Sequence, residues 1–182
     1  MTPRIDYQKI VDAVDYYTRL GYIETEVPWI LPFKAYNATA INYVCRQFAT
    51  LDGYLNASGE QGFIHLLQQG RVLDQNFCIT PCFRDEPILD GIHQTYFLKL
   101  ELFVRDATEE NLQKVIRDAK KFFDRNVETA VVQTGENMYD IIDVKNKIEI
   151  GSYGIRKIKD FEFIYGTGLA LPRFDYIINK NK

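Results

Sequence analysis

The sequence predicts an α+β fold, with an antiparallel sheet of six or seven strands flanked by helices. Several segments alternate apolar and polar residues, which is the pattern of strands with one buried face. A segment after Thr108 places its apolar residues on one helical face, and other predicted helices stand between the strands. A chain of 182 residues suits one core, so we expect 1–182 to fold as a single domain.

The chain begins with a predicted helix and a predicted strand. Apolar residues at helical spacing predict a helix over about 3–19, and Pro3 is acceptable in its first turn. Gly21 ends this helix. Residues 22–27 then alternate like a strand that stops at Pro28. A helix followed by a strand is therefore expected at this end of the chain.

The middle of the chain predicts a short helix and two strong strands. Residues 60–69 have the apolar side of a helix, and residues 77–86 and 96–105 each have the pattern of a strand. The stretch 87–91 between the strands is rich in turn residues. We therefore expect the two strands to form an antiparallel pair.

An amphipathic helix and a second pair of strands follow. Thr108 is the expected N-cap, and Glu109 and Glu110 suit the positive end of the helix dipole. The predicted apolar face consists of Leu112, Val115, Ile116, Ala119, Phe122 and Phe123. Two strands flank residues 145–147, and a glycine-bearing segment, 165–173, closes the chain.

Composition and charge exclude several classes of protein. The formal net charge is -3 and the pI is about 5.5, which does not favour binding to DNA or other nucleic acid by bulk charge. No apolar run approaches the ~18 residues that span a bilayer, and the N-terminus lacks a signal-peptide pattern. We expect a cytoplasmic protein without a membrane partner. Its cysteines, Cys45, Cys78 and Cys82, are expected as free thiols without a zinc site.

Polar residues share one face of the two strong strands. Side chains alternate between the faces of a strand, so an arginine, two glutamates, a lysine and an aromatic ring gather on one side of this pair. These alternating positions are Thr80, Cys82, Arg84 and Glu86 on one strand and Phe97, Lys99, Glu101 and Phe103 on the next. Two interpretations remain open: a solvated face, or a cleft for an anionic, aromatic ligand.

Three motifs that bear on this choice occur in order along the chain. The first is a helix, a Gly-aromatic step, a strand and a proline, in the sequence RLGYIETEVP at 19–28. The second is FRDE at 83–86, followed by His93, Phe97 and Glu101 on the return strand. The third is GTGLALPR at 166–173, in which alanine replaces a third glycine. Each motif alone is weak, but three in order form a specific pattern.

This pattern resembles the three motifs of class II aminoacyl-tRNA synthetases. The resemblance covers about 20–175 and implies an antiparallel-sheet catalytic core that activates a carboxylate with ATP and Mg²⁺. It implies a homodimer with the first motif at the two-fold interface. It also implies an amino acid as substrate and tRNA or another acceptor as partner. No anticodon-binding domain is expected within 1–182.

Further residues resemble the aspartyl and asparaginyl enzymes of this class. The segment EIGSYGIR at 149–156 is similar to their Glu-x-Gly-Gly-x-x-x-Arg strand, and Tyr139-Asp140 is similar to the Tyr-Asp that precedes it. Asp143 competes with Asp140 for the role of partner to Glu149. The segment Ser58-Gly59-Glu60-Gln61 resembles an altered form of their Ser-Pro-Gln, which contacts the amino acid.

The resemblance implies roles at a nucleotide site. Arg84 would bind the α-phosphate and stabilise charge, and Glu86 would accept a hydrogen bond from the adenine amino group. Phe97 and Arg173 would stack on the two faces of adenine, and His93 would lie near the β- and γ-phosphates. The further implied residues are Gly166 and Gly168 for ATP, and Asp140 with Glu149 for Mg²⁺.

The resemblance also implies a pocket for the amino acid. Arg156 would hold a side-chain carboxylate or amide, with aspartate expected first and asparagine second. Arg156 follows Glu149 by seven positions, so both face the site only if a bulge, which Gly151 and Gly154 would permit, interrupts the strand. The other implied substrate residues are Ser58, Glu60, Gln61, His65, Lys99 and Glu101.

Three functions compete at this stage. The first is formation of an aminoacyl-adenylate and transfer of the acyl group to tRNA or another acceptor. The second is synthesis of asparagine, in which ammonia attacks an aspartyl-adenylate. The third is a catalytically inactive relative that binds RNA or protein as a regulator. The retained nucleotide residues favour an enzyme, and the first function is preferred.

Overall fold

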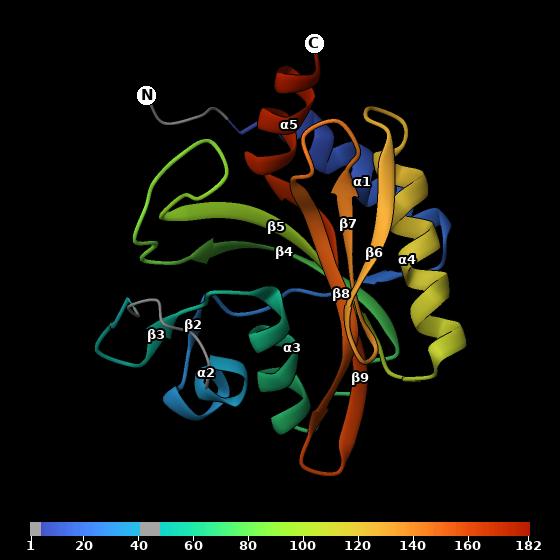
Figure 1. Cartoon of the computed structure of the whole chain (residues 1–182). Coiled ribbons are helices and arrows are strands. Elements are labelled where there is room, and N and C mark those ends of the chain that lie inside the picture. Colours follow the sequence, from blue (N-terminus) through green and yellow to red (C-terminus); the bar gives the residue numbers. More distant parts are fainter. Residues whose placement is uncertain (1–4, 41–47) are drawn as a thin grey trace.

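The computed structural model describes residues 5–40 and 48–182, and a seven-stranded sheet runs through the centre of this part of the chain (Figure 1). The strand order is β1-β4-β5-β9-β8-β7-β6. The strands are β1 (Ile23–Glu24), β4 (Gln75–Phe83), β5 (Tyr96–Val104), β6 (Thr129–Gly135), β7 (Met138–Asp143), β8 (Glu149–Ile158) and β9 (Phe161–Leu171). All neighbours are antiparallel except β1, which pairs with β4 in parallel. The α+β class and the mostly antiparallel sheet are thus confirmed.

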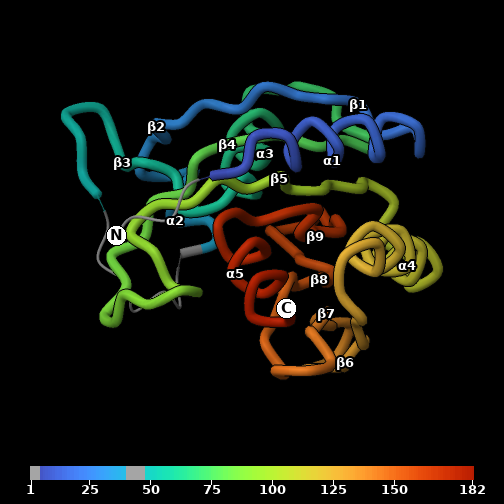
Figure 2. Tube along the Cα trace, turned by 90° about the horizontal axis from the view of Figure 1, so that it is seen from above, coloured from blue at the N-terminus to red at the C-terminus, as the bar shows by residue number. Residues whose placement is uncertain are grey.

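Helices cover both faces of the sheet (Figures 1 and 2). On one face lie α1 (Tyr7–Arg19), α4 (Glu109–Phe123) and α5 (Arg173–Asn181), whose buried residues join the larger hydrophobic cluster. On the other face lies α3 (Gly59–Gln68), which packs on a smaller cluster. Beside α3 are α2 (Phe33–Ala40) and a two-stranded sheet of β2 (Ile30–Leu31) and β3 (Tyr54–Leu55).

Local sequence explains where the outer helices begin. The Thr108 side chain accepts a hydrogen bond from the backbone N–H of Asn111 at 3.2 Å, so the predicted N-cap of α4 is confirmed. The predicted apolar face of α4 is buried. Helix α1 was expected from residue 3, but Asp6 caps it by accepting from the N–H of Gln8 at 3.0 Å, and it begins at Tyr7. Pro3 lies outside the described residues.

Three predicted boundaries differ from the structure. The strand expected over 22–27 is reduced to β1, and Val27, beyond its end, packs against Gly62 of α3. The strand expected to reach residue 86 ends at Phe83, so Arg84 and Glu86 lie in the loop beyond it. The glycine segment forms the end of β9, and α5 follows it as a helix that the sequence analysis did not predict.

The polar face of β4 and β5 is covered rather than solvated. Helix α3 packs over it, and Phe103, Thr80 and Cys82 are buried there, while Glu101 is only 1% exposed. Burial raises the pKa of the Cys82 thiol to about 12, and Cys78 is a second buried free thiol. Cys45 lies outside the described residues. None of the described helices has the length and apolar composition that a membrane-spanning helix needs.

Candidate active site

A cavity of about 300 Å³ opens on the α3 side of the sheet. Its walls are the first turn of α3, the loop after β4, strands β5, β8 and β9, and the start of α5. The structure brings most of the predicted site residues to this one cavity. They are Ser58, Glu60, Gln61, Arg84, Glu86, His93, Phe97, Lys99, Glu101, Glu149, Arg156 and Arg173.

One end of the cavity combines a cation with an aromatic ring. The guanidinium carbon of Arg84 lies 5.0 Å from the centroid of the Phe97 ring, and Arg84 Nε donates to the Ala57 carbonyl at 3.0 Å. Arg84 is thereby held by the loop before α3 as well as by its own loop. A ring and a fixed cation on one wall are the groups that recognise an aromatic base and a phosphate.

His93 is oriented by a tight turn. The Asp90 carboxylate accepts from the backbone N–H groups of Ile92 and His93, each at 2.7 Å, and its Oδ2 lies 3.1 Å from His93 Nδ1. Hydrogen bonds to these backbone N–H groups lower the pKa of Asp90 to about 2. This carboxylate therefore stays ionised and fixes the imidazole at the edge of the cavity.

Of the two predicted metal-binding carboxylates, Glu149 lines the cavity from the start of β8, whereas Asp140 of β7 is not among the lining residues. Arg173, the first residue of α5, donates to Glu149 Oε1 at 2.9 Å. Asp140 lies on the same side of the β7–β8 pair, and burial together with the nearby charge of Glu149 raises its pKa. Oxygen ligands of this kind fit Mg²⁺, which uses one or two carboxylates and completes its shell with phosphate oxygens and water.

Asp143 does not share this position. Its carboxylate is fully buried and accepts from the side chains of Asn146 at 2.8 Å and Asn181 at 2.6 Å, as part of the β7–β8 turn and its contact with α5. Of the two competing aspartates, Asp140 is the one beside Glu149. No cluster of three or more potential metal-binding side chains occurs among the described residues.

A β-bulge brings both ends of β8 to the cavity. Ile141 of β7 pairs with Gly151 and the next residue, Ile142, pairs with Glu149, so Ile150 is the extra residue. The bulge reverses the alternation of side chains, and Glu149 and Arg156 therefore line the same cavity despite their odd spacing. The bulge that the sequence analysis required for Arg156 is present.

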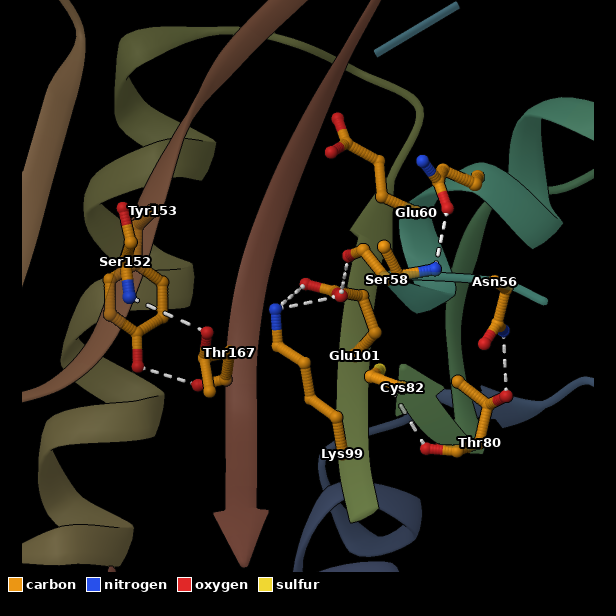
Figure 3. A network of polar contacts seen from close by, with 12 residues as sticks. Asn56, Ser58, Glu60, Thr80, Cys82, Lys99, Glu101, Ser152, Tyr153 and Thr167 are labelled. Carbon is orange, nitrogen blue, oxygen red and sulfur yellow. Dashed lines mark hydrogen bonds and ion pairs between the residues drawn. The ribbon is translucent and has the colours of Figure 1, made fainter. Parts of the chain in front are cut away.

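The floor of the cavity holds a buried polar network (Figure 3). Ser58 Oγ donates to Glu101 Oε2 at 2.6 Å, and Lys99 Nζ donates to Glu101 Oε1 at 2.8 Å. Burial disfavours the Lys99 charge, but Glu101 outweighs it and the pKa of Lys99 is raised. Serine, lysine and glutamate thus hold one another in a single arrangement.

A second ion pair lies next to this network. Arg156 Nε donates to Glu60 Oε1 at 2.5 Å, and the guanidinium lies 4.9 Å from the centroid of the Tyr165 ring. Glu60 is 6% exposed. The side chain predicted to read the substrate is therefore engaged by a carboxylate of the protein itself.

Four predicted residues have other positions or partners. His65 lies in the last turn of α3 and does not line the cavity. A Cβ on Gly166 would meet the Tyr153 ring and one on Gly168 would meet Leu100, so both glycines provide close packing beneath the sheet. The Gln61 amide accepts from Ala57 N at 2.8 Å and donates to the Tyr36 carbonyl at 3.2 Å, so it holds the cavity wall.

Comparison with family models decides the relationship of this chain. A model described as tRNA synthetases class II (D, K and N) matches residues 4–166. The chain belongs to this family. Class II synthetases are ligases that use ATP and Mg²⁺ to form aminoacyl-adenylates and charge tRNA. Comparison with curated proteins found no significant match.

Solved synthetase structures share the fold. A pyrrolysyl-tRNA synthetase from Desulfitobacterium hafniense is 16% identical with a TM-score of 0.76, and the match covers 96% of this chain and 69% of that one. The cytoplasmic serine-tRNA ligase from Naegleria fowleri, determined with AMP, is 16% identical with a TM-score of 0.73. That match covers 94% of this chain and 47% of that one.

Among the lining residues that the sequence analysis missed, three are polar residues of the strands that border this synthetase-family cavity. Ser152, Tyr165 and Thr167 line it from β8 and β9. Thr167 lies opposite Glu101 because Gly168 is an extra residue in β9. Ser152 and Thr167 lie inside motifs that had been noticed, and strand alternation on either side of the glycines was the signal that would have identified them.

Proposed function

We propose that this chain joins an amino acid to AMP through a carboxylate and passes the acyl group to tRNA or another acceptor. The observation that carries the proposal is a single cavity that is lined by both the Arg84–Phe97 pair and the Glu149–Arg173 pair. A nucleotide that filled this space would have its base against Phe97 and its phosphates among fixed cations.

The chemistry follows from the placement of charge. A carboxylate oxygen of the amino acid attacks the α-phosphorus, a new O–P bond forms, and the bond to the bridging oxygen breaks to release pyrophosphate. Arg84 stabilises the charge on the α-phosphate in the transition state, because it is already fixed by its bond to Ala57. Asp140 and Glu149 would hold Mg²⁺, which supplies further neutralisation of phosphate charge.

The substrate we propose is a small amino acid with an acidic or amidated side chain. Arg156 lines the same cavity and offers the planar donors that suit a carboxylate or a carboxamide. Glu101, fixed by Ser58 and Lys99, is the carboxylate placed to receive the substrate ammonium group.

Amino-acid-dependent exchange of pyrophosphate into ATP, measured for each of the twenty amino acids, tests this function. We expect exchange with aspartate or asparagine. Arg84→Ala should lower it by about 10²-fold or more, because preorganised charge is lost. The same variant should lose only about 1 kcal/mol of stability, the magnitude of one hydrogen bond.

A matched control and a product assay complete the test. Arg71→Ala removes an exposed arginine outside the cavity and should leave exchange unchanged. Exchange by Arg84→Ala at the wild-type rate would show that the site is assigned wrongly. Formation of asparagine from aspartate, ATP and ammonia would favour the alternative function, the synthesis of free asparagine. No exchange with any amino acid would favour an inactive regulator.

A further inference from the structure

The ion pair between Glu60 and Arg156 has a consequence for substrate choice. Glu60 occupies the first turn of α3 and Arg156 lies on β8, so the contact joins two segments 96 residues apart in the sequence. The Glu60 carboxylate takes the Nε–H of a guanidinium that carries five N–H donors. A substrate side chain that reaches Arg156 therefore also meets Glu60.

The charges around Glu60 balance. Arg156 faces it from β8, Lys99 and Glu101 face it from β5, and Tyr165 faces it from β9. Two cations and two carboxylates give this part of the cavity no net charge when all four are ionised. Burial raises the pKa of Glu60 to about 7; the nearby cation of Arg156 lowers it, and Glu101 raises it further.

We propose that Glu60 selects a carboxamide side chain over a carboxylate side chain at Arg156. This inference rests on the proposed amino acid substrate. A carboxamide presents a carbonyl oxygen to the arginine donors and an NH₂ group to the ionised Glu60 acceptor, so both partners are satisfied. A carboxylate presents acceptors only and places a second negative charge against Glu60 in a desolvated pocket, where like charges repel strongly.

Protonation of Glu60 changes this preference. A protonated Glu60 no longer repels a bound carboxylate and instead donates a hydrogen bond to it. Binding of aspartate therefore takes up one proton at alkaline pH, whereas binding of asparagine takes up none. The ratio of the dissociation constants, aspartate over asparagine, rises with pH once Glu60 ionises, by up to about tenfold per pH unit.

Isothermal titration calorimetry with aspartate and asparagine tests the inference on the full chain. Titrations between about pH 6 and pH 8.5, in buffers of different ionisation enthalpy, report affinity and proton uptake together. We expect the wild type to show the rising ratio and the proton uptake with aspartate. Glu60→Gln, which is neutral at every pH, should show a constant ratio, tighter binding of aspartate at the alkaline end and no proton uptake.

The control is Glu162→Gln, which removes a half-exposed glutamate of β9 paired with Lys157 and outside the cavity. It should behave as the wild type. A ratio of dissociation constants that stays constant with pH in the wild type overturns the inference. An unchanged preference between aspartate and asparagine in folded Glu60→Gln also overturns it. If the variant does not fold, the pH profile of the wild type decides. Binding of neither amino acid also overturns it. In that case, pyrophosphate exchange with another amino acid would still support the proposed activity.

Discussion

Ionisation of Glu60 works against folding. Its pKa is raised from 4.5 to about 7, so between these values the folded chain holds a proton that the unfolded chain has released. The contribution of Glu60 to the free energy of unfolding therefore falls as pH rises through this window. Relative to the wild type, Glu60→Gln should gain stability on the order of 3 kcal/mol between about pH 4 and pH 8.

Urea unfolding at a series of pH values measures this gain. Arg156 tolerates the loss of the Glu60 charge, because its side chain is 36% exposed and keeps access to water. Glu162→Gln, on the surface, serves again as the control and should show no such trend. A stability difference between Glu60→Gln and the wild type that stays constant with pH would contradict a buried, titrating carboxyl.

Single residues were predictable where a motif fixed their spacing. Arg84 and Phe97 follow one another within a pattern that belongs to one hairpin, and they meet in the structure as expected. The contact of Glu60 with Arg156 was not predictable, because it depends on how α3 lies across the sheet. The role at ATP that the resemblance implied for Gly166 and Gly168 stays a prediction, and in the structure their missing side chains serve the packing of Tyr153 and Leu100.

At the scale of elements, α5 is fixed at both ends. Its first residue, Arg173, bonds Glu149, and near its last turn Asn181 bonds the side chains of Asp143 at 2.6 Å and Asn146 at 2.5 Å. Removal of these bonds in Asn181→Ala should lower the free energy of local opening of α5 by about 1–2 kcal/mol. The KM for ATP should rise more than kcat falls, because Arg173 is then held less firmly.

Hydrogen exchange of the α5 amides and the KM for ATP are the measurements. Asn179→Ala, on the same helix and without a bond to the β7–β8 turn, is the matched control. The Asn181→Asp variant should not restore the exchange protection or the KM of the wild type, because a second carboxylate would face Asp143. Unchanged protection from hydrogen exchange in Asn181→Ala would show that the bonds of Asn181 do not hold α5 in place.

Elements were predictable in proportion to the strength of their periodicity. Helix α4 has a complete apolar face and an N-cap, and it was predicted with its cap residue. Strand β1 is two residues long and α5 has nine, so neither has enough periods for a clear signal. The packing of Val27 on Gly62, beyond the end of β1, is a tertiary contact that local sequence does not encode.

At the scale of the whole molecule, apolar side chains are exposed around β1. Ile23 is 63% exposed and Val72 is 80% exposed, and both line one groove beside Pro28. We propose that a second copy of the chain covers this groove, as the helix–strand unit of the first motif implies. Light scattering at micromolar concentration should give twice the chain mass of 21.2 kDa.

Charge in the groove should separate the two copies. Ile23→Lys with Val72→Lys places two desolvated cations at the proposed contact, and we expect the monomer mass. Val131→Lys changes a partly exposed valine on β6, at the opposite edge of the sheet from β1 and outside the groove, and should leave the mass unchanged. A wild-type monomer at these concentrations would contradict the proposed pairing.

The extra residue in β8 divides the strand into two sections, in which the alternation of side chains between the two faces of the sheet has opposite phase. Upstream of Ile150 the residues at odd positions face the cavity, and downstream those at even positions do, so Glu149 and Arg156 belong to different sections. Deletion of Ile150 would restore one continuous phase and move only one section out of the cavity. Glu149 and Arg156 therefore reach the same cavity from separate sections of one strand, and a change of register in one section leaves the side chains of the other section in place.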